Sequence, residues 1–201
     1  MCEHYIARAA EPFRLHELWP FTAKLERFGI AGFGWGAAWL GDDGRLHSHR
    51  DMRAFCDDPA GRFSFSHNGD LRDYRALRAT YREQGRIHGR ADTEVGARWL
   101  EDAWRPDEPA AHLLAALHDR FGGNANLAVL AADGTPHHYA GNGENPVFAF
   151  RLGSIGLAST GIYSLDRSLF RFVAPSSTDR RLVGVRATVT LGRNGEALTA
   201  S

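Results

Sequence analysis

Cysteine is scarce in this chain of 201 residues, which contains only Cys2 and Cys56. Two cysteines cannot build a disulfide framework, and such low usage is typical of a reducing compartment. Long apolar runs are also lacking, because the stretch FGIAGFGWGAAWL is interrupted by glycines and is shorter than the ~20 residues that cross a bilayer. Charged residues follow Met1 closely, so no apolar secretory segment is expected. We therefore expect a soluble, cytoplasmic protein with no membrane partner.

An excess of one charge is absent too, because Lys plus Arg and Asp plus Glu each number 24. The basic residues are spread through the chain, so no electrostatic field recruits nucleic acid, and we expect none as a partner. Hydrophobic residues make up 43% of the chain, which is enough for a sizeable core. Repeats and linkers are also missing, and we predict a single domain over 1–201.

A metal-binding pattern is a further absence. His47 and His49, and the pair His137 and His138, lack accompanying Cys, Asp or Glu residues at ligand spacing. We interpret all of these as solvated or packing histidines. We predict neither a metal nor any other cofactor.

The first half of the chain predicts a hairpin. Residues 32–40 form an apolar strand pattern, Asp43-Gly44 is a turn signal, and a return strand runs through His49. Trp35 and Trp39 fall on one face of that strand and are interpreted as core. Residues 51–60 are expected to form a short helix.

The next segment predicts a strand that leads into a helix. Phe63 and Phe65 alternate onto one strand face, and Asn68-Gly69 is expected to end the strand. Apolar positions then recur at helical spacing from Leu71 up to Gly85.

Two further helices and a series of strands complete the pattern. The first helix is expected to begin at Asp92 as its N-cap, and the second to lie between Pro109 and Gly122. The last third consists of strand patterns separated by Asp133-Gly134, Gly153-Ser154 and Asn194-Gly195 turns, with one short helix, GIYSLDRSLF, among them. Strands on both sides of a run of helices predict an α+β fold, a four-layer αββα sandwich of two antiparallel sheets flanked by helices.

Cys2 stands directly after Met1. Removal of the methionine would leave a thiol and a free α-amino group on one residue. A thiol with a pKa of ~8.5 is mostly protonated at neutral pH, whereas an α-amine of ~7.7–8.0 can accept its proton, so Cys2 is a candidate nucleophile with its own base. A chance cysteine in a frayed terminus is the alternative.

Four short motifs occur in a fixed order: MCEHY, GFGWGAAW, SFSHNGDL and ADTEV. Their order resembles that of the class II glutamine amidotransferase family, in particular its stand-alone members among the N-terminal-nucleophile hydrolases. The resemblance covers the first half of the chain, and the later strands match only in general character. It implies the four-layer fold and Cys2 as the nucleophile.

Attack of a thiol on an amide creates an oxyanion, which needs donors aimed at it in a site with little water. Asn68 can offer its side-chain NH₂ and Gly69 its backbone N–H, and the resemblance gives these two residues that role. An ordinary Asn-Gly turn is the alternative. Asp92 is a simple helix cap or, by the resemblance, the carboxylate that receives the substrate's α-ammonium group.

The chain departs from the family in one segment. Family members usually place another strand before the HNG motif, and its arginine grips the α-carboxylate of glutamine. We do not find that strand here. Arg50, Arg53 and Arg62 are the candidates to replace its arginine, and no spacing selects one of them.

Two hypotheses follow. The first is an amidohydrolase or glutamine amidotransferase that hydrolyses the γ-amide of glutamine or of a γ-glutamyl compound, a small-molecule amide. Any ammonia would leave or pass to a separate synthase subunit. The second is a catalytically silent relative that uses the fold as a binding or assembly module.

Overall fold

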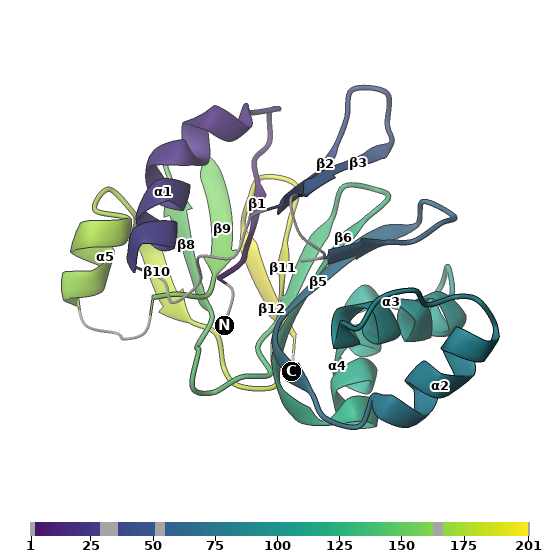
Figure 1. Ribbon diagram of the computed structural model, residues 1–201. Helices are drawn as coiled ribbons and strands as arrows, with labels where there is room; N and C mark the ends of the chain where they lie inside the picture. The colour runs from purple at the N-terminus through teal and green to yellow at the C-terminus, as the bar shows by residue number, and fades with distance from the viewer. Residues whose placement is uncertain (1–2, 29–35, 51–54, 163–166, 201) are drawn as a thin grey trace.

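A computed structural model gives the structure of the protein (Figure 1) and describes residues 3–28, 36–50, 55–162 and 167–200. Its strands form two larger antiparallel sheets and one separate hairpin. The first sheet has the order β1-β9-β8-β10, with β1 Tyr5–Arg8, β9 Ile155–Ser159, β8 Phe148–Leu152 and β10 Thr178–Leu182. The second has the order β12-β11-β7-β6-β5-β4, with β12 Ala197–Ala200, β11 Thr188–Leu191, β7 Pro136–Tyr139, β6 Gly123–Ala131, β5 Phe63–Leu71 and β4 Phe55–Asp57.

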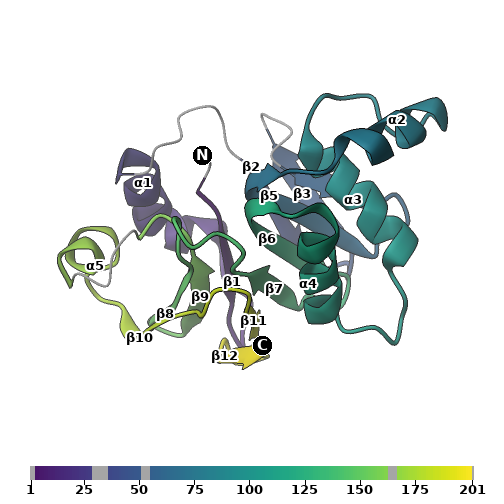
Figure 2. The same cartoon turned by 90° about the horizontal axis from the view of Figure 1, so that it is seen from below.

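Helices cover the outer faces of both sheets, as the two views in Figures 1 and 2 show. On the first sheet lie α1 Trp19–Phe28, preceded by the short 3₁₀ turn η1 Leu15–Leu18, and α5 Arg167–Val173. On the second sheet lie α2 Arg75–Glu83, α3 Asp92–Ala103 and α4 Ala110–Phe121. The arrangement is the predicted four-layer αββα sandwich. No helix among the described residues is long and apolar enough to cross a bilayer.

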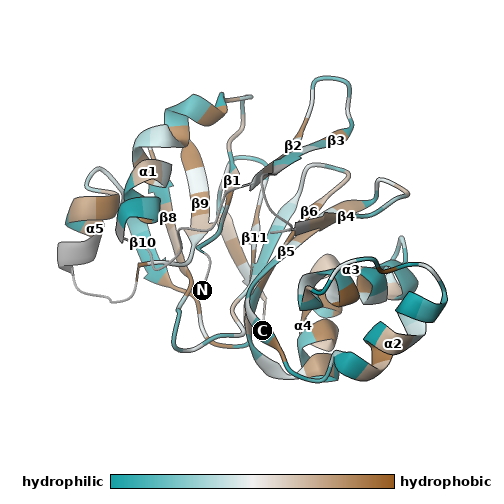
Figure 3. Ribbon diagram, in the orientation of Figure 1, coloured by the Kyte–Doolittle hydropathy of each residue, from teal (hydrophilic) through white to brown (hydrophobic). Residues whose placement is uncertain are grey.

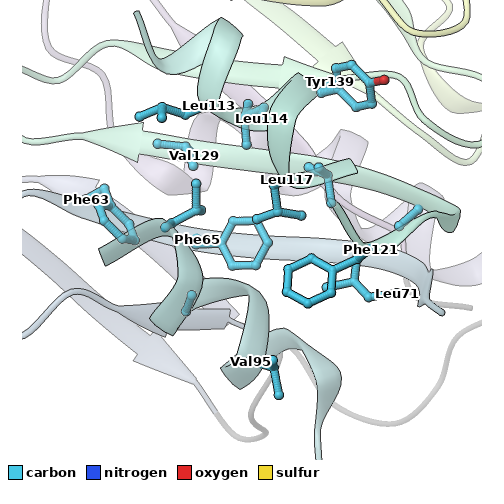
Figure 4. Packing of buried hydrophobic residues seen from close by; sticks show 14 of the residues in the cluster. Phe63, Phe65, Leu71, Val95, Leu113, Leu114, Leu117, Phe121, Val129 and Tyr139 are labelled. Atoms are coloured by element: carbon cyan, nitrogen blue, oxygen red, sulfur yellow. The ribbon is translucent and has the colours of Figure 1, made fainter. Parts of the chain in front are cut away.

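Three groups of buried side chains hold these layers together. The largest lies between β5, β6 and the helices α2–α4 and contains large apolar side chains such as Phe65, Leu117 and Phe121 (Figure 4). A second lies between the first sheet and its helices and includes Phe21, Phe150 and Phe170. The third lies between the two sheets and consists mainly of alanines and valines. Its small side chains leave room there for polar residues.

The helices are amphipathic, because one side of each packs on a sheet and the other meets water. In Figure 3 they carry both hydrophilic and hydrophobic segments. The predicted ends of α4 are confirmed, with Pro109 before its first residue and Gly122, at a φ of 60°, after its last. Gly85, at a φ of 71°, follows α2 and permits the left-handed turn that ends it.

The hairpin prediction is confirmed within the described residues. Strands β2, Gly36–Leu40, and β3, Leu46–Arg50, pair around the Asp43-Gly44 turn and form a separate two-stranded sheet (Figure 1). The core prediction for Trp39 is wrong, because this side chain is 45% exposed and stacks on His47. Trp35 lies outside the described residues.

Two further predictions are wrong, one about the end of a strand and one about the type of an element. Strand β5 does not end at Asn68-Gly69 but continues to Leu71, since Asn68 pairs with Asn126 and Gly69 with Ala125 in β6. Residues 55–57 of the predicted short helix form strand β4 instead, which pairs with β5 and forms the edge of the sheet. The side of β5 that faces away from β6 is thus occupied by a strand of three residues.

Candidate active site

Asn68 lies in β5 on the face that points toward the first sheet. Its side chain is 1% exposed, and its Nδ2 donates to Thr160 Oγ1 at 3.4 Å. Among the described residues its Oδ1 has no hydrogen-bond partner. A buried amide with an unused acceptor costs free energy, so this placement favours a role beyond packing.

Gly69 cannot be replaced without moving the backbone. Its φ is 124°, and a Cβ at this position would lie 1.9 Å from the carbonyl oxygen of Asn124. Glycine alone adopts this conformation readily. The residue therefore keeps β5 paired with β6 and lets the chain next to Asn68 approach its neighbour closely.

Asp92 begins α3, but it is not the predicted N-cap. The N-cap position belongs to Ala91. Asp92 Oδ1 accepts from the backbone N–H of Thr93 at 3.1 Å, and Oδ2 accepts from the backbone N–H of Leu71 in β5 at 3.0 Å. His67 Nε2 lies 3.3 Å from the same oxygen, within ion-pair range, although the angle is outside hydrogen-bond geometry. The carboxylate thus ties α3 to the end of β5.

The environment keeps Asp92 ionised. Burial alone would raise the pKa of its carboxyl, but the neighbouring His67 imidazole and the backbone N–H of Leu71 hold this pKa at about 2. An ionised carboxylate accepts up to about four hydrogen bonds. Asp92 can therefore accept from a bound ammonium group without losing its present partners.

His67 lies beside Asp92, and sequence reasoning gave it no role although the HNG motif contains it. Its Nδ1 lies 2.8 Å from Thr93 Oγ1, and its Nε2 faces Asp92. His67 and Asn68 are successive in β5, so their side chains point to opposite faces of the strand. Asp92, which lies beside His67, is therefore on one side of β5, and the Asn68 side chain is on the other.

Thr160, directly after β9, connects Asn68 with the start of the chain. Its Oγ1 accepts from the backbone N–H of His4 at 3.0 Å as well as from Asn68. No sequence pattern pointed to Thr160. Cys2, two residues before His4, lies outside the described residues.

Two histidines, the partly buried His4 and the fully buried His138, lie beside Thr160. The rings of His4 and His138 are 4.4 Å apart, and His4 Nδ1 is 3.4 Å from Ser66 Oγ. Burial lowers the pKa of His138 to about 4, and burial together with the nearby His138 and His67 lowers the pKa of His4 well below its ordinary value. Both rings are therefore neutral at pH 7, and His138 packs between the sheets.

Arg62 is not available to bind a substrate carboxylate. Its Nε lies 2.7 Å from Asp58 Oδ2, and one terminal nitrogen lies 3.0 Å from Oδ1 of the same residue, whose side chain is buried. This fork occupies the guanidinium in a structural turn. Arg53 and the side chain of Arg50 lie outside the described residues.

In the part of the chain that the structure describes, no group of three or more His, Cys, Asp or Glu side chains is arranged to hold a metal ion. His47 lies on the exposed hairpin and pairs with Asp43 at 2.9 Å. His137 is half-buried, and its Nδ1 lies 2.8 Å from Thr190 Oγ1. Cys56, on β4, is also half-buried.

Comparison with solved structures shows that the chain shares its fold with proteins of known structure, among them a glutamine amidotransferase and a class-II domain protein. The chain is similar to a glutamine phosphoribosylpyrophosphate amidotransferase from B. subtilis in complex with ADP and GMP, with a TM-score of 0.71 and 14% identity over 99% of this chain and 49% of that one. It is also similar to an allosteric regulatory enzyme of purine biosynthesis, with a TM-score of 0.70 and 13% identity over 99% of this chain and 48% of that one.

A third similar structure is a glutamine aminotransferase class-II domain protein from Silicibacter pomeroyi, with a TM-score of 0.56 and 16% identity over 99% of this chain and 97% of that one. The chain spans about half the length of the first two structures. No family model and no curated protein sequence matches the chain. At these identities the similarity establishes the fold.

Proposed function

We propose that the protein is an amidohydrolase or glutamine amidotransferase that cleaves the γ-amide of glutamine or of a γ-glutamyl compound with Cys2 as nucleophile. The observation that carries the proposal is the contact of Asn68 with Thr160, whose hydroxyl also accepts from the backbone N–H of His4. One hydroxyl thus links a buried amide donor to the backbone of His4, two positions after the proposed nucleophile in the sequence, and this link supports the proposal.

The chemistry follows from these groups. The thiol of Cys2 gives its proton to the free α-amine, and its sulfur forms a bond with the γ-carbonyl carbon. The resulting oxyanion accepts hydrogen bonds from Asn68 Nδ2 and the backbone N–H of Gly69. Collapse of this intermediate breaks the C–N bond, and the α-ammonium group returns a proton to the leaving ammonia. Water then hydrolyses the thioester and releases the γ-carboxylate.

Asp92 is the proposed partner of the substrate's α-ammonium group. Its low pKa, about 2, keeps the carboxylate charged over the whole physiological range. A charge-assisted contact with a half-buried carboxylate orients the substrate so that its amide reaches the nucleophile.

Recognition of the α-carboxylate is the weaker part of the site. Arg62 is occupied by Asp58, which leaves Arg50 and Arg53 as the candidates. We therefore expect free glutamine to be a poor substrate and a γ-glutamyl compound with a blocked or extended α-carboxylate to be better. Ammonia, where it is the product, leaves or passes to a separate synthase subunit.

The first test concerns the amino terminus. Intact mass of the protein from its native host should show loss of Met1, because a retained or acetylated methionine would deprive the reaction of its proton acceptor.

The second test compares the two cysteines. An electrophilic glutamine analogue should label Cys2 and spare Cys56, which serves as the matched control. Hydrolysis of a panel of γ-glutamyl amides should be abolished in Cys2→Ala and retained in Cys56→Ala. If the wild type and Cys2→Ala are equal on every amide, the enzyme hypothesis fails and the binding module replaces it.

A further inference from the structure

Five polar residues form a connected network between the two sheets. Asn68, Asn126, Asn145 and Thr160 are at most 1% exposed, and the fifth member is Glu3. The members come from β5, β6, the segment before β8, the residue directly after β9 and the residue after Cys2. Resting on the proposed function, we propose that Glu3 and Thr160 are positioning residues that fix the orientation of the Asn68 amide.

The argument begins at Asn145, whose orientation is unambiguous. Its Oδ1 accepts from the backbone N–H of Gly161 at 3.2 Å, and a backbone N–H can only donate. The NH₂ of Asn145 therefore faces the other way and donates to Glu3 Oε2 at 3.3 Å. Asn126 holds this segment in place, since its Nδ2 donates to the carbonyl of Asn145 at 2.7 Å.

Thr160 donates to the same carboxylate oxygen. Its Oγ1 lies 2.8 Å from Glu3 Oε2, closer than its alternative acceptor, the carbonyl of His4, at 3.2 Å. An ionised carboxylate only accepts, and a hydroxyl has a single proton. The Thr160 proton is thus committed to Glu3, and its oxygen can only accept from other neighbours.

This commitment decides which way Asn68 points. Thr160 Oγ1 accepts from the backbone N–H of His4 at 3.0 Å and from Asn68 at 3.4 Å. Rotation of the Asn68 amide by 180° would set Oδ1 against an oxygen that has no proton to give. The Asn68 NH₂ therefore stays on the side of Thr160, and its second N–H is held available for an oxyanion.

The consequence is specific to the transition state. Loss of the Thr160 hydroxyl removes the constraint on Asn68 but leaves Asp92 and its partners untouched. Thr160→Val should lower kcat about tenfold, the effect of roughly one misplaced hydrogen bond, with KM little changed. Thr160→Ser keeps the hydroxyl and should restore most of the rate. Glu3→Gln should also lower kcat. A glutamine amide, unlike a carboxylate, can donate to Thr160 Oγ1, so the Thr160 proton would no longer be committed to residue 3.

The matched control is Thr190→Val, which removes a β11 hydroxyl that contacts His137 away from this network. It should leave kcat unchanged. Thr190 is half-buried and Thr160 is fully buried. A general cost of replacing a hydrogen-bonded hydroxyl by a methyl group would lower the melting temperature of both variants.

A double-mutant cycle tests whether Thr160 acts through Asn68. The double variant Asn68→Ala/Thr160→Val should be no slower than Asn68→Ala alone. A further tenfold loss in the double variant, or an unchanged kcat in Thr160→Val, would overturn the proposal.

An NMR measurement separates this inference from the proposed function. In ¹⁵N-labelled protein, the side-chain NH₂ of Asn68 should show contacts with the backbone N–H of His4 and slow proton exchange. Both should be lost in Thr160→Val and kept in Thr160→Ser. If all three proteins give the same signals, Thr160 does not hold the amide, whether or not the chain hydrolyses any substrate.

Discussion

The two faces of strand β5 differ sharply in what they contact. Phe63 and Phe65 point toward the helices. They are at most 1% exposed and are surrounded by other large apolar side chains. Ser64, Ser66 and Asn68 point the other way, and each makes a hydrogen bond to a side chain from another part of the chain. One strand thus contributes alternately to the largest core and to the candidate site.

The two faces also differ in the size of the side chains that they bury. Large apolar side chains dominate the core between β5 and its helices, whereas alanines and valines dominate between the sheets. Burial of large side chains contributes ~1.5–3 kcal/mol each. The space between the sheets gives up part of that gain to hold buried polar groups, which need specific partners.

The largest expected effect is on the core face. Phe65→Ala should lower the free energy of unfolding by about 3–5 kcal/mol, because it leaves a cavity between β5 and α3. Chemical denaturation measures this loss. Phe65→Leu, which fills more of the space, should cost clearly less. Equal stability of wild type and Phe65→Ala would mean that this face does not form the main core.

Asn68→Ala should have the opposite signature. Loss of one oxyanion donor lowers kcat by about 10²–10³, while the fold survives. Steady-state kinetics on a γ-glutamyl amide, together with thermal unfolding, measures both quantities. A variant that loses stability but keeps its kcat would identify Asn68 as a structural residue of β5 and remove the contrast between the two faces.

Acid should weaken the space between the sheets first. His138 is neutral in the folded protein, with its pKa lowered from 6.5 to about 4, so the unfolded chain binds a proton first as pH falls. The contribution of neutral His138 to the free energy of unfolding is fully present above pH ~6.5 and is lost as the pH falls toward ~4. This loss amounts to about 3 kcal/mol, at ~1.4 kcal/mol per pKa unit. The lowered pKa of His4 adds to this loss.

Denaturation at pH 7.5 and pH 4.5 checks the effect of His138. In His138→Gln the difference between the two pH values should shrink. His16→Gln, at an exposed position, is the matched control and should leave the difference as in the wild type. Identical behaviour of both variants would show that His138 does not link stability to pH.

The smallest effect is expected on the separate hairpin. Trp39 is 45% exposed and stacks on the ring of His47, with the two ring centroids 5.9 Å apart. Trp39→Ser should therefore change the free energy of unfolding by no more than about 0.5 kcal/mol. A loss comparable to that of Phe65→Ala would place Trp39 in a core, as the sequence alone had suggested.

Much of the fold could be predicted because its signals are local. The ends of α4 follow from Pro109 and Gly122, and the turns between the late strands follow from Asp133-Gly134 and Asn194-Gly195. The described part of the predicted helix GIYSLDRSLF is shifted, since α5 runs from Arg167 to Val173. Strand β10, with every residue exposed, has no apolar pattern and was not anticipated.

The errors occur where distant residues override a local signal. Asn-Gly favours a turn, yet Asn68 and Gly69 stay in β5 because β6 pairs with them over their whole length. Asp92 looks like a helix cap, but its carboxylate bonds to Leu71, 21 residues earlier. Nothing in a short window contains such partners.

The sequence by itself determined most of the helices and strands, the four-layer class and the residues at which chemistry is expected, since periodicity, turn residues and side-chain types are properties of neighbouring positions. Only the tertiary structure decided that Arg62 belongs to Asp58, that His67 faces Asp92, and that Thr160 joins Asn68 to the chain beyond Cys2. These pairings join residues from different elements. A hydrogen bond depends on distance and direction in space, and those are fixed only once the sheets pack together.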